Sequence, residues 1–492
     1  MNNTLNKNND FTCIAVDMGA SSIRVMLGAI KRDGLSYKEI HRIPNEIVEM
    51  DGHERWDMDR IWNGIREGIS KALEMSDSAP SSIGVDSWGV DFVLLDEEGE
   101  RLEHPVAYRD KRTEGMQELW ETLMPGVETF RRTGINFYIF NTLFQFFSLK
   151  DSEVMQRVSK ILFIPAYINY LLSGSARNEL TISSTSQVLG VKGDQWDPEI
   201  LQKLHMEEAL LGEVTPPGAR LGSVTWPQPD GSQMENVAVC GHDTACVVAA
   251  IPVDNPNFAY ISAGTWCIVG IETDTPLISE DALKLGITNE RGYNNSYRSL
   301  KNIVGLWLVQ GLKSQLPEET SYSDIEVMVG EGEPVMQVID PDDPLFYNPE
   351  DMRMAFDTYF GKTGQQKPEE FTGYLSCAYD SLCFSFRYHI ERLEKLSGKS
   401  IEVLHLVGGG SQSEILNQRI ATICGRAVIS GPVEGATLGN ILIQAIAMGR
   451  ISSLEEGRKL LKQSCTTSTY HPEPAREQLE MRYERFVNLK ET

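Results

Sequence analysis

A His-Asp pair, His242-Asp243, stands between a short apolar run at residues 236–239 and a stretch of small and β-branched residues that predicts a packed helix. A carboxylate at such a corner can accept the proton of a substrate hydroxyl, as a general base does. It can also cap the helix through its side-chain oxygen. The two interpretations do not exclude each other, and both predict a strand-to-helix corner.

A second acidic residue, Asp17, lies near the end of the apolar run "FTCIAVDMGA" and is followed by the small residues of "GASS". A tight turn of small residues can present backbone N–H groups to phosphate oxygens. Asp17 could then hold a hydrated Mg²⁺ on those phosphates. An ordinary hairpin with an Asx turn explains the same residues without a ligand.

Two glycine-containing turns occur in the second half of the chain, in "ISAGTW" and "HLVGGGSQSEILNQ". In the first, Gly264 and Thr265 could approach a phosphate, although a plain hairpin explains the turn equally well. In the second, three glycines separate an apolar strand from a helix N-terminus. That arrangement favours close approach of a negatively charged ligand, and a tight strand–helix connection rarely needs three glycines.

Several common nucleotide and hydrolase motifs are absent. "GKT" at 361–363 and "GKS" at 398–400 resemble the end of a P-loop, but Phe356 and Leu393 replace the glycine required five residues earlier. "GGGSQS" lacks the last glycine of G-x-G-x-x-G, since Ser413 stands there. No HExxH and no G-x-S-x-G motif occurs, which argues against zinc and serine hydrolases.

Two polar stretches, "DSWGVDFVLLD" at 86–96 and "AYRDKRTEGM" at 107–116, follow the first set of strands. We expect Trp88 to be a core residue and Asp91 to be a turn residue. The charged run Arg109 to Arg112 predicts a solvated loop. The alternative is a lining of hydrogen-bonding groups for a polyhydroxylated ligand.

The elements that position these residues alternate between hairpins and helices. The first half predicts strands within 11–43 with a turn at Asp33-Gly34, a helix after "WDMD", further strands within 82–103, and a mostly helical middle part. The second half repeats this order and contains a long helix that ends at Gly398. Both halves predict α/β domains with mixed sheets, meeting near residue 250.

Length and composition agree with this organisation. A chain of 492 residues is too long for one ordinary core. Its net charge of −25 argues against nucleic acid as a partner. The sequence shows neither a signal peptide nor a membrane-spanning segment, and the eight cysteines are scattered without C-x-x-C spacing. We therefore expect buried free thiols, no membrane partner and a cytoplasmic location.

Taken together and in order, these stretches resemble the FGGY carbohydrate kinases of the hexokinase–actin–heat-shock superfamily, from about Phe11 to about Met448. The resemblance implies an α/β fold of two actin-like (ribonuclease H-like) domains, with mixed sheets flanked by helices and the active site in the interdomain cleft. Residues 1–250 would form the N-terminal FGGY domain, with the sugar site and the phosphate loop. Residues 251–492 would form the C-terminal FGGY domain, which binds the nucleotide. The stretches that carry the resemblance are "VDMGASSIRVML", "DSWGVDFVLLD", "AYRDKRTEGM", "GHDTA", "GTW", "LKNIVGLWLVQ" and "VGGGSQSEILNQ…GPVEGATLGN".

The resemblance also implies residue roles. Asp243 would be the catalytic base, and Asp17 would hold Mg²⁺ through water. The residues at the sugar would be Gly89, His242, Asp243, Thr244 and Asn302. The residues at ATP would be Asp17, Ala20, Ser21, Ser22, Ile23, Arg24, Thr265, Gln310, Gly409 and Gly410. Two departures affect side-chain contacts: Ile23 stands where relatives often have glycine, and Ala263 where they often have serine.

The implied activity is ATP- and Mg²⁺-dependent phosphorylation of a small sugar. "DSWGVDFVLLD" together with "YRDKRT" favours L-rhamnulose, phosphorylated at its 1-hydroxyl, over glycerol, xylulose or gluconate. Another deoxy-ketose such as L-fuculose remains an alternative. A non-sugar actin-like or chaperone-like ATPase, or a silent sugar sensor, is a third. The sequence shows no DNA-reading or peptide-binding module for such roles, and it predicts no oligomeric state.

Overall fold

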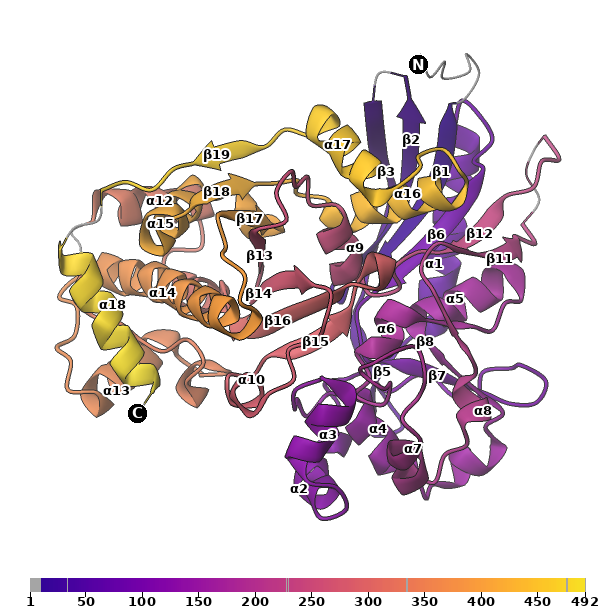
Figure 1. Cartoon of the computed structure of the whole chain (residues 1–492), viewed down its shortest axis with the longest axis horizontal. Helices are drawn as coiled ribbons and strands as arrows, with labels where there is room; N and C mark the ends of the chain where they lie inside the picture. The colour runs from indigo at the N-terminus through magenta and orange to yellow at the C-terminus, as the bar shows by residue number, and fades with distance from the viewer. Residues whose placement is uncertain are drawn as a thin grey trace. The chain divides into compact units, whose positions relative to one another are not determined.

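The fold is described from a computed structural model, which covers residues 10–32, 34–226, 228, 230–332, 335–474 and 477–491. The chain forms two compact units, whose elements Figure 1 labels. Unit 1 comprises Met1–Pro252, Thr273–Ser299 and Glu434–Ser464; unit 2 comprises Val253–Glu272, Leu300–Val433 and Cys465–Thr492. The first segment of unit 1 ends close to the expected boundary at 250. Two segments from the second half of the chain also belong to unit 1.

The sheet of unit 1 has six strands in the order β11-β12-β6-β1-β2-β3. β6 is parallel to both β1 and β12, whereas β2 and β3 run antiparallel in two hairpins. The carboxyl ends of the three parallel strands therefore meet at one edge of the sheet, where ligand sites of α/β folds commonly lie. The strands are β1 (Phe11–Met18), β2 (Ser22–Lys31), β3 (Gly34–Pro44), β6 (Ser82–Ser87), β11 (Ala219–Ser223) and β12 (Glu235–Ala238).

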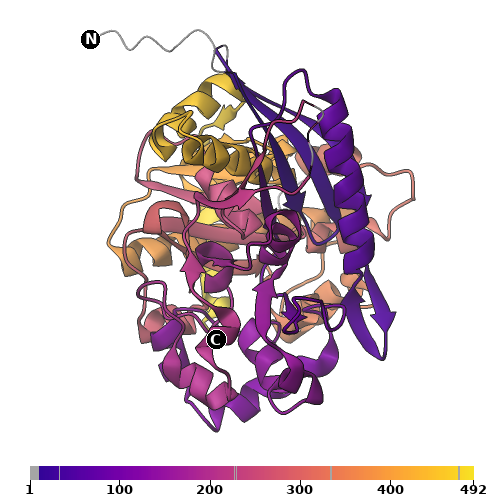
Figure 2. The same ribbon diagram turned by 90° about the vertical axis from the view of Figure 1, so that its right-hand side faces the viewer.

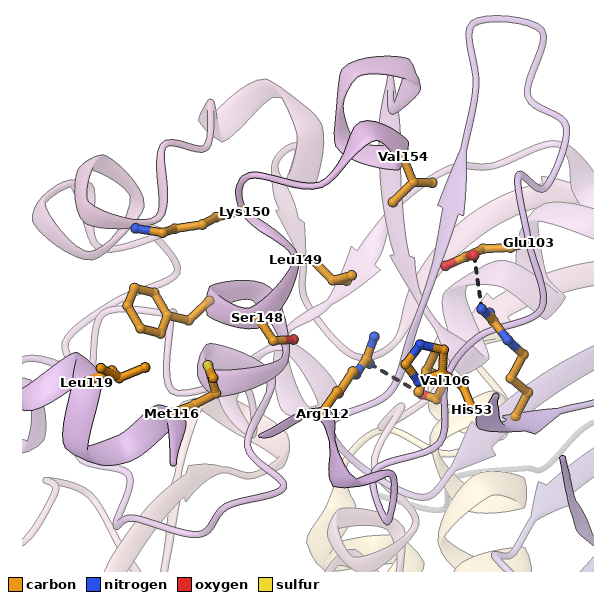
Figure 3. Close-up of a pocket in the computed structure, with 12 residues that line it drawn as sticks. His53, Glu103, Val106, Arg112, Met116, Leu119, Ser148, Leu149, Lys150 and Val154 are labelled. Atoms are coloured by element: carbon orange, nitrogen blue, oxygen red, sulfur yellow. Dashed lines mark hydrogen bonds and ion pairs between the residues drawn. The ribbon is translucent and has the colours of Figure 1, made fainter. Parts of the chain in front are cut away.

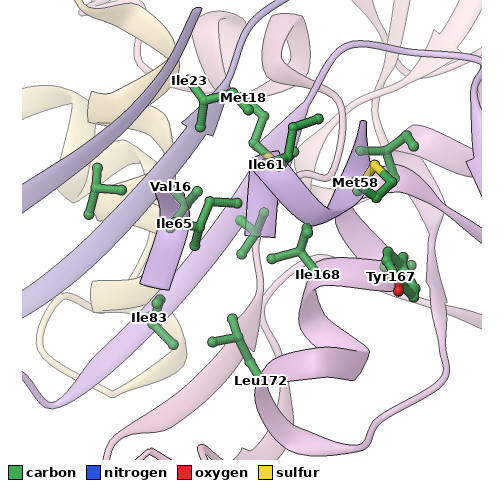
Figure 4. Close-up of a cluster of buried hydrophobic side chains, with 14 of the residues drawn as sticks. Val16, Met18, Ile23, Met58, Ile61, Ile65, Ile83, Tyr167, Ile168 and Leu172 are labelled. Atoms are coloured by element: carbon green, nitrogen blue, oxygen red, sulfur yellow. The ribbon is translucent and has the colours of Figure 1, made fainter. Parts of the chain in front are cut away.

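Helices cover both faces of this sheet. α1 (Met58–Met75) and α5 (Ile164–Ser173) pack on one face, because alternate strand residues such as Val16 and Ile83 meet apolar helix residues spaced three or four apart (Figure 4). α16 (Gly435–Ala447) contacts β1 and β6. Figure 2 shows the strands of this sheet between α16 and α17 (Leu454–Ser464), in yellow, and the violet helix α1. Asp17 belongs to the face that meets α16.

A second apolar cluster in unit 1 is formed by the short strands and helices that lie between β6 and β11 in the sequence. The additional strands of unit 1 are β4 (Ile47–Met50), β5 (His53–Trp56), β7 (Phe92–Leu95), β8 (Lys160–Phe163), β9 (Asn178–Glu179), β10 (Val214–Thr215) and β15 (Thr288–Arg291). Its additional helices are α2 (Met116–Glu121), α3 (Gly126–Thr133), α4 (Thr142–Leu149), α6 (Leu180–Ser184), α7 (Pro198–Leu204), α8 (Glu208–Leu211), α9 (Asp243–Ala249) and α10 (Glu280–Lys284). Its 3₁₀ turns are η1 (Lys111–Thr113), η2 (Glu153–Arg157) and η3 (Tyr293–Asn295).

The strands β16, β14, β13, β17, β18 and β19 follow one another in this spatial order. They belong to unit 2, except for residues 297–299 of β16 and Thr273 of β14, which belong to unit 1. The strands are β13 (Phe258–Ala263), β14 (Trp266–Thr273), β16 (Tyr297–Val304), β17 (Val403–Val407), β18 (Ala427–Ser430) and β19 (Ser468–Tyr470). The long predicted helix is α14 (Phe371–Ser397), and it ends at Gly398, whose φ of +70° is the left-handed conformation of a C-terminal glycine. The other helices are α11 (Trp307–Lys313), α12 (Tyr322–Glu331), α13 (Met352–Lys362), α15 (Glu414–Cys424) and α18 (Glu477–Lys490), with 3₁₀ turns η4 (Pro344–Phe346) and η5 (Gly409–Gln412).

Most expected elements are confirmed. The hairpin β2–β3 is present, although Asp33 of its predicted turn lies outside the described residues, as do residues 1–9 of the polar start. All eight cysteines are free, and all except the half-buried Cys465 are buried. Among the described residues, no helix combines the length and apolar character needed to cross a bilayer.

Candidate active site

The three parallel strand ends of unit 1 bring Asp17 and the predicted corner, residues 239–243, to one edge of the sheet. The backbone N–H of Ser87, the last residue of β6, donates to the carbonyl of Gly241 at 2.9 Å. The next N–H, of Trp88, donates to the carbonyl of Met18 at 3.1 Å, at the end of β1. The turn after β6 is therefore bonded to both neighbours, and the sequence-distant acids share one edge.

Asp17 is buried and held by two side chains. Its Oδ2 accepts hydrogen bonds from Arg24 Nη2 at 2.6 Å and from Thr437 Oγ1 at 3.1 Å. Arg24 also pairs with Glu434. Burial raises the pKa of Asp17, the charge of Arg24 opposes the rise, and the nearby charge of Asp243 adds to it. Asp243 is thus close enough to affect the ionisation of Asp17.

Asp86 is a further acid at this edge, and the sequence analysis did not select it. It is fully buried, and Asn440 Nδ2 donates to its Oδ2 at 2.6 Å. Burial, followed by the charges of Asp17 and Asp243, raises its pKa well above the ordinary value. Asn440 belongs to a buried polar stripe on α16 with Thr437 and Gln444, which face the sheet at i, i+3 and i+7. Such a stripe on an otherwise apolar helix is the signal that could have identified these residues.

These acids fit a divalent cation. Asp86 Oδ1 is buried and has no hydrogen-bond partner among the described residues. Asp17 and Asp86 are direct partners on β1 and β6, the charge of Asp243 raises the pKa of both, and carboxylate oxygens are the ligands that Mg²⁺ prefers.

A second acidic group, Asp57 and Asp59 with His104, has ligand atoms within 4.8 Å of one another. It does not fit a metal ion. His104 Nδ1 accepts the N–H of Met58, so that Nε2 carries the ring proton in the neutral form, and Asp59 is bonded to Arg101.

The predicted phosphate turn connects β1 to β2. The N–H of Gly19 donates to the carbonyl of Ser22 at 2.9 Å, which closes the turn. Ala20 and Ser21 are exposed at its tip, but the side chain of Ile23 is fully buried in the apolar core. Only the backbone of Ile23 is therefore left for a nucleotide contact.

The corner departs from one expectation. His242, not Asp243, occupies the N-cap position of α9, and its side chain makes no capping hydrogen bond. Asp243 is the first helical residue, and its Oδ1 accepts from the backbone N and the Oγ1 of Thr244 at 2.5 and 3.0 Å. The helix begins one residue earlier than a capping role for Asp243 requires. The carboxylate remains 30% exposed.

The remaining predicted sugar residues of unit 1 surround this carboxylate. His242 Nε2 lies 3.4 Å from Asp243 Oδ1 and 3.5 Å from Thr244 Oγ1. A Cβ atom added to Gly89 would lie 3.5 Å from the same nitrogen, so Gly89 keeps the space beside the imidazole open. Asn302 is on β16 in unit 2 and is half-buried.

Trp88 is a core residue, as expected, with its ring centroid 4.4 Å from that of Trp56. Asp91 lies at the turn after β6, where its N–H donates to the carbonyl of Gly89 at 2.9 Å. It is buried, and its carboxylate accepts hydrogen bonds from both tryptophans and from Gln145. Burial raises the pKa of Asp91 to about 6, although these hydrogen bonds oppose the rise. Asp91 therefore supports the turn after β6 from within the protein.

The charged run is partly solvated and partly buried. Arg109 and Lys111 are exposed, as a solvated loop predicts, whereas Asp110 is buried. Arg112 donates to Gln145 Oε1 at 2.6 Å and lines a cavity of about 470 Å³ together with His53 (Figure 3). The apolar side of this cavity is formed by α2 and α4.

Unit 2 brings together two predicted nucleotide residues. Thr265 Oγ1 and Gln310 Nε2 lie 3.3 Å apart, and Thr265 is exposed. Gly409 is exposed, and a Cβ atom there would meet nothing within 4 Å. Gly410 is different, because a Cβ atom on it would lie 2.6 Å from Cβ of Ala263. Close packing against Ala263 explains why residue 410 is a glycine, whereas Gly409 leaves open space at the turn.

Two segments of the chain match the sequence models of one protein family. The N-terminal domain model of the FGGY family of carbohydrate kinases matches residues 12–251, and the C-terminal domain model matches residues 259–448. The chain belongs to the FGGY family of carbohydrate kinases. It is therefore a sugar kinase, and membership of this kinase family implies that it uses ATP.

Relatives of this FGGY kinase cover nearly its whole length. A rhamnulokinase of Bacteroides thetaiotaomicron is 38% identical over 464 residues, which are 93% of this chain and 95% of that protein. A rhamnulokinase of Bacillus subtilis is 37% identical over 461 residues, with the same coverage.

Solved structures of FGGY kinases share the fold. A ligand-bound xylulose kinase from Lactobacillus acidophilus has a TM-score of 0.80 at 16% identity, covering 98% of this chain and 97% of that one. Plasmodium falciparum glycerol kinase with ADP has a TM-score of 0.81, also at 16% identity and with the same coverage. These similarities confirm the expected α/β fold of two domains with mixed sheets flanked by helices.

Two further residues of this FGGY kinase, the buried Arg298 and the largely buried Glu290, were not indicated by the sequence patterns. Glu290 Oε2 lies 3.0 Å from His242 Nδ1, and Arg298 Nη2 lies 2.7 Å from the same oxygen. Both come from the segment Thr273–Ser299, which belongs to unit 1 although it follows residue 250. Glu290 and Arg298 are charged residues on strands, and nothing in the sequence around them indicates that they contact His242.

Proposed function

We propose that this sugar kinase transfers the γ-phosphoryl group of ATP to the 1-hydroxyl of L-rhamnulose, which yields L-rhamnulose 1-phosphate in L-rhamnose breakdown. The observation that carries the proposal is the 37–38% identity, over 93% of the chain, to two proteins named rhamnulokinase. The stretches "DSWGVDFVLLD" and "YRDKRT" favour the same substrate.

In this proposal Asp243 is the catalytic base. It accepts the proton of the sugar hydroxyl as that oxygen attacks the γ-phosphorus. The partly exposed carboxylate beside His242 and Thr244 supports this role. Gly89, His242, Thr244 and Asn302 contact the sugar. Phosphoryl transfer needs little covalent chemistry from the protein, so in-line positioning and charge neutralisation are the main requirements.

We assign the sugar site and the phosphate turn to unit 1 and further nucleotide contacts to unit 2. Asp17 would hold Mg²⁺ through water, and the cation, when bound, neutralises phosphate charge. The pairing of Asp17 with Asp86 on neighbouring strands supports a cation there. The nucleotide contacts are the backbone of the turn Ala20, Ser21, Ser22 and Ile23 with Arg24, and Thr265, Gln310, Gly409 and Gly410.

A coupled ADP-release assay on a ketose panel tests the substrate. The panel contains L-rhamnulose, L-fuculose, D-xylulose, glycerol and no sugar, and phosphorus NMR maps the phosphorylated position of the product. We expect the highest kcat/KM for L-rhamnulose and a 1-phosphate product. A higher value for L-fuculose would change the substrate and leave the mechanism intact. Turnover of ATP that is independent of every sugar would overturn the proposal and favour an actin-like ATPase.

A further inference from the structure

His242 is bonded on one side to a buried ion pair. Its Nδ1 lies 3.0 Å from Glu290 Oε2 and 3.0 Å from Arg298 Nη2, and these two groups are 2.7 Å apart. Arg298 is fully buried, and the side chain of Glu290 is only 12% exposed. All three residues belong to unit 1. The opposite ring nitrogen, Nε2, faces Asp243 and Thr244.

The contacts decide which nitrogen of the neutral ring carries the proton. Glu290 is ionised: burial raises the pKa of this carboxyl, but the charge of Arg298, 2.7 Å away, opposes the rise, and the pKa is lowered from its ordinary value. A lone pair on Nδ1 would face this anionic oxygen at 3.0 Å, which is repulsive. A proton on Nδ1 instead makes a charge-assisted hydrogen bond to Glu290. Arg298 Nη2 also lies 3.0 Å from Nδ1, but it donates to Glu290 at the shorter distance of 2.7 Å, and we therefore assign the Nδ1 proton to the Glu290 contact.

We propose that Glu290 is a positioning residue that keeps the ring proton of His242 on Nδ1, so that Nε2 presents a lone pair to a hydroxyl group of the sugar. Arg298 holds Glu290 in place through the buried ion pair. The inference deepens the proposed function and depends on it, because it assigns a sugar contact to His242. Neither Glu290 nor Arg298 contacts the reacting atoms in this role.

The position of this proton also affects the base. Nε2 is 3.4 Å from Asp243 Oδ1. A proton on Nε2 would be shared with that oxygen and would compete with the substrate hydroxyl for it. With the proton on Nδ1, His242 does not donate to Asp243 Oδ1, and the sugar hydroxyl supplies the donor between the two acceptors. Loss of Glu290 should therefore lower kcat as well as raise KM for the sugar.

Nitrogen NMR of the wild-type enzyme labelled with ¹⁵N-histidine is the direct test. The signals of His242 are assigned by their loss in His242→Asn. At a pH where the ring is neutral, we expect Nδ1 to have the shift of a protonated nitrogen and Nε2 that of an unprotonated one. The opposite tautomer, or a ring protonated on both nitrogens throughout the stable pH range, would overturn the proposal. This measurement needs no Glu290 variant to fold.

Kinetics provide a second readout. Glu290→Gln should lower kcat/KM for the accepted ketose at least tenfold, whereas Glu290→Asp, which keeps the charge, should recover part of the loss. Glu280→Gln is the matched control on the same segment, because Glu280 makes only an exposed ion pair at 3.5 Å to Arg131. Thermal unfolding identifies any variant that fails to fold, since removing one partner of a buried pair is destabilising.

A double-mutant cycle separates positioning from general structural damage. In a His242→Asn background, Glu290→Gln should cause little further loss of kcat/KM, because its effect acts through the imidazole. Fully additive losses would overturn the proposal. If the ketose panel replaces L-rhamnulose by another sugar, the cycle is measured with that sugar. Failure of the substrate assignment is then distinguishable from failure of the positioning role.

Discussion

Asp17 and Asp86 are direct partners on neighbouring parallel strands, β1 and β6, and both side chains bond to α16. Each is at most 3% exposed, and burial is the largest cause of the raised pKa of both. Arg24 neutralises Asp17, whereas Asp86 is bonded to the uncharged Asn440. A cation at this edge would stabilise both carboxylates in their charged forms.

Replacing Asp17 by Asn should therefore weaken the use of Mg²⁺. We expect the Mg²⁺ concentration for half-maximal activity at fixed ATP to rise about 10- to 100-fold, the range seen when groups around a bound metal are removed. Steady-state activity across a Mg²⁺ series measures this. Asp230→Asn, at an exposed loop position, is the control. An unchanged Mg²⁺ dependence in Asp17→Asn would remove this residue from the cation site.

The elements around Asp17 could be predicted because local patterns determine them. Buried β1 is a continuous apolar run, and α1 presents Ile61, Ile65 and Ile69 on one buried face. The position of Asp17 at a strand end and of His242-Asp243 at a strand-to-helix corner followed from the same patterns.

The partners of these residues could not be predicted in the same way. Glu290, Thr437 and Asn440 reach the site from segments far away in sequence, and only tertiary packing brings those segments into unit 1. The burial of Asp91 could not be predicted for a related reason. A polar residue in a turn is usually solvated, and the two tryptophans that bury Asp91 are not adjacent in sequence.

Asp91 should make stability depend on pH. Its folded pKa of about 6 is above the value of about 3.9 for an unfolded Asp. The native state therefore binds more protons than the unfolded state between these values, so the free energy of unfolding falls as the pH rises through this window. Asp91→Asn should remove a fall of about 2 kcal/mol between pH 4 and 7. Denaturant unfolding at several pH values measures it.

The control for this pH series is Asp281→Asn, at an exposed position in the first turn of α10. Its free energy of unfolding should follow the wild-type pH dependence. Parallel curves for Asp91→Asn and wild type would show that Asp91 titrates near its unfolded value.

Gly439 sets the distance between α16 and α9, the helix that begins at Asp243. A Cβ atom on Gly439 would lie 2.0 Å from the carbonyl oxygen of Cys246. Gly439→Ala should therefore lower the free energy of unfolding by about 1–3 kcal/mol or more and reduce kcat, because α9 must move. Gly361→Ala, on α13 with open space around the added methyl, should be neutral or stabilising by up to about 1 kcal/mol. Equal effects in the two variants would contradict this.

Gly409 and Gly410 in unit 2 allow the effect of packing to be distinguished from the effect of ligand contact. Gly410→Ala would place a methyl 2.6 Å from Ala263, so its melting temperature should fall. Gly409→Ala meets nothing within 4 Å, so its melting temperature should stay close to wild type. If ATP approaches this turn, Gly409→Ala should nevertheless raise KM for ATP several-fold. A normal KM for ATP in Gly409→Ala would exclude Gly409 from the nucleotide site.

Asp243→Asn tests the base itself. Asn has nearly the shape of Asp and can keep the hydrogen bonds from Thr244, but it cannot accept the proton of the sugar hydroxyl. General base catalysis typically contributes about 10²- to 10⁴-fold, so kcat should fall by that factor while the Kd for the sugar, measured by calorimetry, changes little. Thr244→Val, which removes one donor to the carboxylate but keeps the base, should lose much less of kcat. Full activity in Asp243→Asn would show that another group accepts the proton, and the proposed mechanism would then fail at its central step.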